Sequence, residues 1–150
     1  MIFVDADSCE KSARKFVLTA AVNKNINVIF AANKNIPFDF NSPLFKMQIC
    51  SKDKNSADDF IIENSRPGDI VVTRDLILAE RIFSKNIAVI NDKGTVFNKE
   101  NLAYLIEERQ LSIQMKKLGV STGGKWKNYS GRDFENFKKS LSALLGKSFS

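Results

Sequence analysis

Short apolar runs alternate along the chain with longer stretches in which apolar residues recur every three or four positions. A short apolar run predicts a buried strand, alternation of apolar and polar residues predicts a half-exposed strand, and the longer periodicity predicts a helix. The predicted strands lie at 2–4, 26–31, 45–50, 69–73 and 87–91. The predicted helices lie at about 9–25, 56–65, 74–86, 98–118 and 132–145.

The order of these elements predicts an α/β protein, a three-layer α/β/α sandwich with a largely parallel sheet. The run at 69–73 is rich in β-branched residues, as are parallel strands buried on both faces. The 150 residues match the length of one domain, and no repeat or linker divides them. We therefore expect a single domain over 1–150, with a basic helical part at about 111–150.

The charge is distributed unevenly. Residues 1–110 hold 15 basic and 15 acidic side chains, whereas residues 111–150 hold 8 basic and 2 acidic ones, which accounts for the whole net charge of +6. Such asymmetry is compatible with a polyanionic partner such as RNA, and equally with a solvated basic surface.

Bases and aromatic residues interleave in the segment before the last predicted helix. Lys125, Trp126, Lys127, Tyr129 and Arg132 could contact a single nucleic-acid strand, with bases stacked on the rings. Alternatively, the rings attach the last helix to the core while the lysines face water. The sequence leaves both interpretations open.

The absence of histidine limits the chemistry. It excludes a Ser-His-Asp or Cys-His system and every zinc site that contains histidine. Any metal would be held mainly by oxygen atoms, which suit Mg²⁺ or Mn²⁺. The two cysteines form no CxxC motif, and no apolar run is long enough to span a bilayer, so we expect a cytoplasmic protein without a membrane segment.

Carboxylates gather where predicted strands end or helices begin. Asp5 and Asp7 follow the first strand, Asp58 and Asp59 open a helix, and Asp75 follows the 69–73 strand. Ligands of open parallel sheets bind at the carboxyl ends of the strands, and carboxylates crowded there repel one another unless a cation binds. The competing interpretation assigns these residues to helix caps and first turns, which favour Asp for structural reasons.

Several segments, in this order, resemble the YaiI/YqxD family of bacterial proteins. They are VDADSC, ANKN, SADDFIIENS, RPGDIVVTRDLILAE, INDKG, and STGG followed by GRDFENFKKSL. The resemblance implies a PIN-like fold in which acidic residues at strand ends bind Mg²⁺ or Mn²⁺ and hydrolyse RNA. The family pattern matches at Asp5, Asp7, Asp58, Asp59, Thr73 and Asp75. The chain departs from it at Glu10 and Lys125, where the family usually has proline, and neither change removes a carboxylate.

The resulting hypothesis is a divalent-metal-dependent phosphodiesterase that acts on RNA. Asp5, Asp75 and either Asp58 or Asp59 would hold one or two ions, and Asp7 would hold a water molecule or the second ion. Thr73 would orient a ligand or phosphate. The bases expected to hold the polyanion are Lys125, Lys127 and Arg132.

Two alternatives stay open. The first is a non-catalytic module that binds RNA or a partner and keeps the acidic pocket as a structural cation site. The second is a haloacid-dehalogenase-like phosphatase, because VDAD imitates the DxD pair of that class. The second needs another acidic pair at a later strand end, where this chain offers only Asp92.

Overall fold

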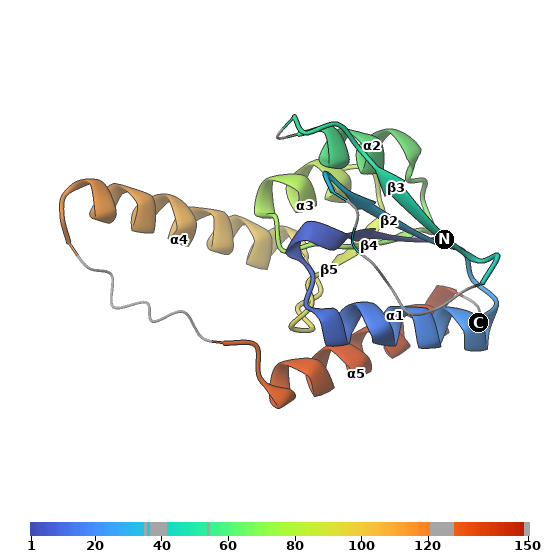
Figure 1. The fold of residues 1–150 in the computed structure, drawn as a ribbon. Coiled ribbons are helices and arrows are strands. Elements are labelled where there is room, and N and C mark those ends of the chain that lie inside the picture. The colour runs from blue at the N-terminus through green and yellow to red at the C-terminus, as the bar shows by residue number, and fades with distance from the viewer. Residues whose placement is uncertain (35, 37–41, 54, 121–127, 149–150) are drawn as a thin grey trace.

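A computed structural model describes residues 1–34, 36, 42–53, 55–120 and 128–148. Its centre is one sheet of five strands in the order β3-β2-β1-β4-β5 (Figure 1). Each neighbouring pair of strands is parallel. The strands are β1 (Ile2–Asp5), β2 (Val28–Ala32), β3 (Phe45–Ile49), β4 (Ile70–Val72) and β5 (Ala88–Ile90).

Helices cover both faces of this sheet. In Figure 1, α1 and α5 lie together on one side of the strands and α2 and α3 lie on the other, while α4 runs outward from the α3 side. The helices are α1 (Lys11–Lys24), α2 (Ser56–Asn64), α3 (Leu76–Phe83), α4 (Lys99–Lys117) and α5 (Gly131–Ser148). The predicted three-layer α/β/α sandwich with a parallel sheet is therefore confirmed.

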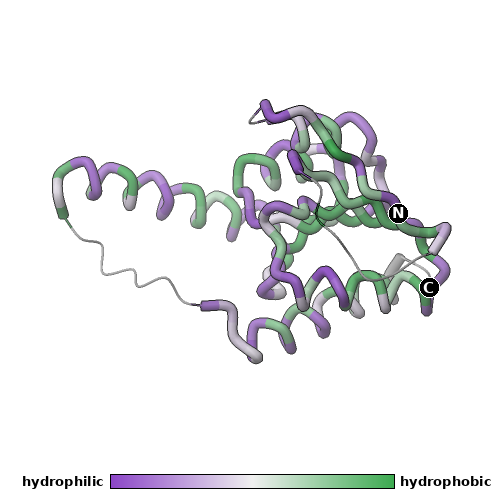
Figure 2. Tube along the Cα trace, viewed as in Figure 1, coloured by the Kyte–Doolittle hydropathy of each residue, from purple (hydrophilic) through white to green (hydrophobic). Residues whose placement is uncertain are grey.

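The two helical layers enclose two hydrophobic cores, one on each face of the sheet. Successive side chains of a strand point to opposite faces, so Val4 packs with α1 and α5 while its neighbour Phe3 packs with α2, α3 and α4. Apart from Asp5 at the end of β1, the central strands are apolar (Figure 2), as is typical of strands buried on both faces. This burial fixes the strand ends, and so the residues that follow them.

A close contact joins α5 to the turn after β5. A Cβ atom at Gly94 would lie 2.6 Å from the backbone of Asn136, and the φ of Gly94 is +91°, so only glycine fits here without strain. The Ser140 hydroxyl donates a hydrogen bond to the Gly94 carbonyl at 2.7 Å. The two contacts hold α5 against the sheet.

The apolar pattern predicted for 98–118 is only partly buried. Leu102 is the one residue of α4 that is fully buried, whereas Leu111, Ile113 and Leu118 are exposed. The three exposed residues belong to the outer part of α4, which continues past α3 and the sheet (Figure 1). Among the helices that the structure describes, none combines the length and the apolar character needed to cross a membrane.

Candidate metal centre at the carboxyl ends of the strands

A pocket of about 420 Å³ opens beyond the carboxyl ends of β1 and β4. The chain continues from β1 to β2 on one side of the sheet, while β4 and β5 extend it on the other, so the pocket lies at the point where strand order reverses. Open parallel sheets bind ligands at this point. The pocket is lined by Asp5, Asp7, Ser8, Asn33, Ala57, Asp58, Arg74, Asp75, Leu76 and Arg109.

Asp5, the last residue of β1, lies at the bottom of the pocket. Its side chain is 6% exposed, and its Oδ2 accepts hydrogen bonds from the hydroxyls of Thr73, at 2.8 Å, and Ser8, at 2.9 Å. Burial raises the pKa of Asp5, the two hydroxyl bonds oppose that rise, and the charges of Asp7 and Asp75 add to it. Asp5 is thus a carboxylate held in one orientation and crowded by like charges.

Thr73 connects the carboxylate of Asp5 to the backbone of Asp75. Its hydroxyl donates to Asp5 and accepts a hydrogen bond from the backbone N–H of Asp75 at 3.0 Å. The Thr73 side chain is fully buried and does not line the pocket. In this geometry Thr73 orients Asp5 from behind, whereas the sequence predicted that it orients a ligand or phosphate.

Asp75 has both of the roles that the sequence analysis offered as alternatives, helix cap and pocket residue. It is the N-cap of α3, and its Oδ1 accepts hydrogen bonds from the N–H groups of Ile77 and Leu78 at 2.9 and 3.2 Å. It also lines the pocket. Helix capping therefore positions this carboxylate at the strand ends.

The structure distinguishes Asp58 from Asp59. Asp58 lines the pocket, whereas Asp59 is exposed and forms an ion pair with Arg81 at 3.4 Å. Desolvation, followed by the charges of Asp5 and Asp75, raises the pKa of Asp58 to about 6. Asp58 is therefore the α2 residue that meets the carboxylates from the strand ends, and Asp59 is not brought to them.

Asp7 reaches the pocket by an unexpected route. The chain does not stay extended after β1 but forms a short 3₁₀ turn at Ala6–Ser8, and Asp7 is exposed on it. Its Oδ2 accepts a hydrogen bond from the N–H of Asn33, which follows β2, at 3.0 Å. The side-chain Oδ1 of Asn33 is a buried acceptor without a partner in the part of the chain that the structure describes.

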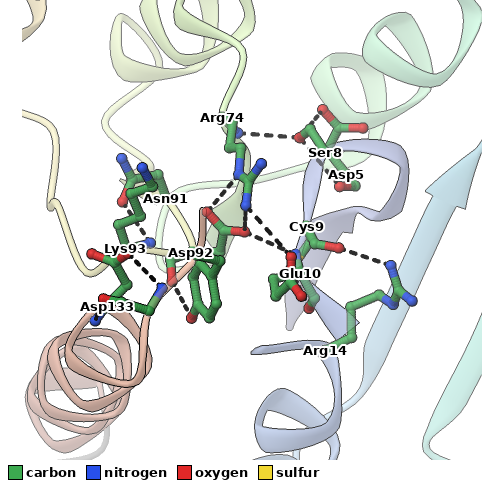
Figure 3. Close-up of polar contacts among 12 residues, drawn as sticks. Asp5, Ser8, Cys9, Glu10, Arg14, Arg74, Asn91, Asp92, Lys93 and Asp133 are labelled. Carbon is green, nitrogen blue, oxygen red and sulfur yellow. Dashed lines mark hydrogen bonds and ion pairs between the residues drawn. The ribbon is translucent and has the colours of Figure 1, made fainter. Parts of the chain in front are cut away.

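Two arginines that the sequence analysis did not select also line the pocket. Arg109 reaches it from α4, and Arg74 lies between Thr73 and Asp75. Arg74 forms a two-point ion pair with Asp92, with Nε–Oδ1 at 2.7 Å and Nη2–Oδ2 at 2.6 Å (Figure 3). The TRD segment could have indicated Arg74, but nothing local indicates Arg109, which is distant in sequence.

Asp92 stands apart from the acidic pocket. It is 1% exposed, and besides Arg74 its Oδ2 accepts a hydrogen bond from the N–H of Glu10 at 2.8 Å. The Tyr129 hydroxyl donates to the Asp92 carbonyl at 2.6 Å. This contact agrees with the interpretation that Tyr129 attaches the last helix to the core.

Of the three bases predicted to bind the polyanion, the structure describes only Arg132. Lys125 and Lys127 lie outside the described residues. Arg132 is exposed at the start of α5 and does not line the pocket. Within the described residues, Arg74 and Arg109 are the cations that the fold brings there.

The donor set has the chemistry of a hard-cation site. Asp5, Asp7, Asp58 and Asp75 offer carboxylate oxygens around one pocket, and the unpartnered Asn33 Oδ1 adds an amide oxygen. No cluster of three or more acidic, histidine or cysteine side chains close enough to hold an ion was found over the described ranges. The donor atoms are therefore of the kind that Mg²⁺ and Mn²⁺ prefer, and an ion among them would take part of its ligands from water, as Mg²⁺ commonly does.

Fold and pocket together define a parallel α/β/α sandwich with an acidic pocket at the switch point of its sheet. The family model described as "Uncharacterized BCR, YaiI/YqxD family" matches residues 3–147. The chain belongs to this family.

Relatives from diverse bacteria align along nearly the whole chain. A UPF0178 protein of Treponema denticola is 33% identical over 146 residues, which cover 97% of this chain and 92% of the relative. A UPF0178 protein of Legionella pneumophila strain Paris is 31% identical over 147 residues, with 98% of each chain covered. The search of solved structures gave no significant match. These names state no activity.

Proposed function

We propose that the protein is a divalent-metal-dependent phosphodiesterase of PIN-like type that acts on RNA in the cytoplasm. The observation that carries the proposal is the convergence of Asp5, Asp58 and Asp75, from β1, α2 and the loop after β4, on one pocket. Their mutual effect on the pKa of Asp58 indicates that these charges act on one another. Such repulsion is relieved when a cation binds.

Under this proposal, each residue of the pocket has a separate role in binding the metal ion or in positioning its ligands. Asp5, Asp58 and Asp75 would hold Mg²⁺ or Mn²⁺, with Asp7 at the exposed edge for a water ligand or a second ion. The bound ion would supply Lewis-acid activation of water and charge stabilisation at phosphorus. Thr73 and Ser8 keep Asp5 in one orientation through the two hydroxyl bonds to its Oδ2.

The arginines would bind the phosphate. Arg109 lies on the outward-running α4, and Arg74 is fixed by Asp92, so two guanidinium groups border the carboxylates. A phosphodiester that bridges these groups to a cation would meet positive charge on both sides. Lys125, Lys127 and Arg132 stay candidates for further contacts with the polyanion.

A non-catalytic module with a structural cation site is the second candidate. The lack of a ready cluster of three ligands over the described ranges favours it, because phosphodiesterases of this type rely on firmly placed ions. It predicts RNA binding that weakens with salt and no turnover. The phosphatase alternative gains no support, since Asp92, the acid at the later strand end, is buried and paired with Arg74.

The proposal is tested by cleavage of single-stranded RNA with Mn²⁺, with Mg²⁺ and with excess chelator. We expect metal-dependent cleavage by the wild type and a loss of at least about 100-fold in Asp5→Asn and in Asp58→Asn, because each removes a ligand charge. Asp59→Asn, one residue away but outside the pocket, is the matched control and should cleave normally. Equal cleavage by all four proteins, or cleavage that survives the chelator, would contradict the proposal.

A further inference from the structure

The outer part of α4 extends beyond the pocket. The helix packs on α3 through its first turns, and Figure 1 shows the remainder running on in the direction in which β1 points, past the carboxyl ends of the strands. Leu102 is buried and Arg109, seven residues later, lines the pocket, so these two residues mark the face of α4 that is turned toward the body of the protein. We call it the inner face of α4.

Basic residues lie on the inner face, and acidic residues lie on the opposite side of the helix. At 3.6 residues per turn, Lys116 and Lys117 lie within about 60° of Leu102 around the helix axis, whereas the acidic pair at 107–108 lies at least about 120° from it. Arg109, Lys116 and Lys117 are all exposed, and we call these three residues the α4 track.

The positive charge of the α4 track is not neutralised within the described part of the chain. An acid three or four positions away along the helix would pair with each base, but these positions hold only apolar or uncharged polar residues. None of the three bases forms an ion pair with a residue that the structure describes. The track therefore offers its charge to an anion from outside the chain.

We propose that the α4 track binds successive phosphates of an RNA strand whose scissile phosphate lies in the pocket, an inference that rests on the proposed function. The track begins at the pocket with Arg109, and Lys116 lies about 10 Å farther along the helix, at a rise of about 1.5 Å per residue. A stacked strand rises about 3.4 Å per nucleotide, so the two lysines meet phosphates about three nucleotides from the pocket. A small phosphoester does not reach them.

The side chain between the charges favours a nucleic acid over a polyanion that consists of charge alone. Ile113 lies on the inner face between Arg109 and Lys116, and it is 43% exposed. Surfaces that bind single strands combine cations along the backbone with less polar side chains against the bases. Ile113 can contact a base or ribose while the cations on either side hold phosphates, whereas inorganic polyphosphate offers it no apolar group.

Binding of a fluorescent oligouridine of about 12 nucleotides, several times the length of the track, tests the proposal without turnover. Anisotropy is measured on the full chain with excess chelator at several salt concentrations. We expect Lys116→Gln, Lys117→Gln to bind at least about tenfold more weakly than the wild type at low salt. The slope of log affinity against log salt should fall by about 1.4, because each phosphate contact in a single strand contributes about 0.7.

The matched control is Lys24→Gln, Lys46→Gln. It removes the same charge from exposed lysines that do not line the pocket, and it should bind like the wild type. Equal binding by the wild type, the track variant and this control, or no binding by the wild type at low salt, would overturn the proposal. Competition by polyphosphate as strong, per phosphate, as competition by unlabelled oligouridine would overturn the assignment to RNA.

Cleavage of the same oligouridine with Mn²⁺ separates this proposal from the proposed function. We expect Lys116→Gln, Lys117→Gln to raise KM and to leave kcat within about twofold, because the two lysines hold the strand away from the reacting phosphate. Metal-dependent cleavage with an unchanged KM in this variant would contradict the track and leave the activity. Weaker binding by this variant, with no cleavage by any of the proteins, would support the track as an RNA-binding surface and contradict the activity.

Discussion

Asp92 and the carboxylates of the pocket lie at the same end of the sheet but differ in their interaction partners. Asp92 is 1% exposed, and its charge is matched by the two-point ion pair with Arg74. Asp5 and Asp58 face a pocket with further carboxylates, and the pKa of each is raised. The charge of Asp92 is thus matched by a fixed partner, whereas the carboxylates of the pocket raise one another's pKa.

This difference distinguishes a structural carboxylate from carboxylates that are candidates for a functional site. A buried carboxylate with a fixed arginine is a structural feature, even beside a pocket, because its interactions are satisfied. Carboxylates that raise one another's pKa cost stability, and such cost is typical of functional sites. The comparison can be tested by removing the compensating group in one place and the excess charge in the other.

The largest effect should follow Arg74→Met. This variant leaves the buried Asp92 carboxylate without its partner, and we expect the free energy of unfolding to fall by about 3 kcal/mol. Urea unfolding at pH 8 measures it. Arg81→Met is the matched control, because the Arg81–Asp59 pair is exposed and its loss should change stability little. Equal effects of the two variants would show that Asp92 is not stabilised by Arg74.

Thr73→Val should have a smaller effect. The change keeps the shape of the side chain but removes the hydroxyl that donates to Asp5 and accepts from the N–H of Asp75. We expect a loss of about 1–2 kcal/mol, because a buried carboxylate loses a donor. The pKa of Asp5 should rise further, which carbon-detected NMR of the carboxyl group measures. An unchanged pKa would contradict the role of Thr73 in orienting Asp5.

The smallest effect should be a gain in stability from Asp58→Asn. Because the pKa of Asp58 in the folded protein is about 6, above its ordinary value, the folded state binds more protons than the unfolded state between about pH 4 and 6. The contribution of Asp58 to the free energy of unfolding of the wild type therefore falls as the pH rises through that range. Above pH 6 we expect Asp58→Asn to be more stable by about 1 kcal/mol, a value reduced for the partial exposure of the side chain.

The pH dependence provides the check on this gain. Thermal unfolding at pH 4 and pH 8, without divalent metal, should show the advantage of Asp58→Asn at pH 8 and none at pH 4. Asp59→Asn should match the wild type at both. A gain at pH 4 as large as at pH 8 would mean that charge repulsion is not its cause.

The fold was largely predictable because its signals are local. Apolar runs and helical periodicity fix the parallel strands, and the strand ends bring Asp5 and Asp75 to one edge. The pairing of Arg74 with Asp92 was not predictable, because the two residues are 18 positions apart and meet only through the adjacent strands β4 and β5.

The other differences between the predicted and the observed site residues depend on where a helix begins and how far it extends, not on residue type. Either Asp58 or Asp59 could face the pocket, and the start of α2 at Ser56 decides between them. Arg109 reaches the pocket only because α4 packs its first turns on α3 and then continues past the sheet (Figure 1). No local pattern reveals how far a helix extends beyond the layer that it covers.

Calorimetric titration with Mn²⁺ tests the central claim most directly, with the wild type, Asp58→Asn and Asp59→Asn compared at pH 7.5 and pH 5. We predict binding to the wild type and to Asp59→Asn at pH 7.5, weaker binding to both at pH 5 as Asp58 takes up a proton, and weak binding to Asp58→Asn at either pH. Equal binding by the three proteins, or none by the wild type, would contradict the claim that the acidic pocket is a cation site.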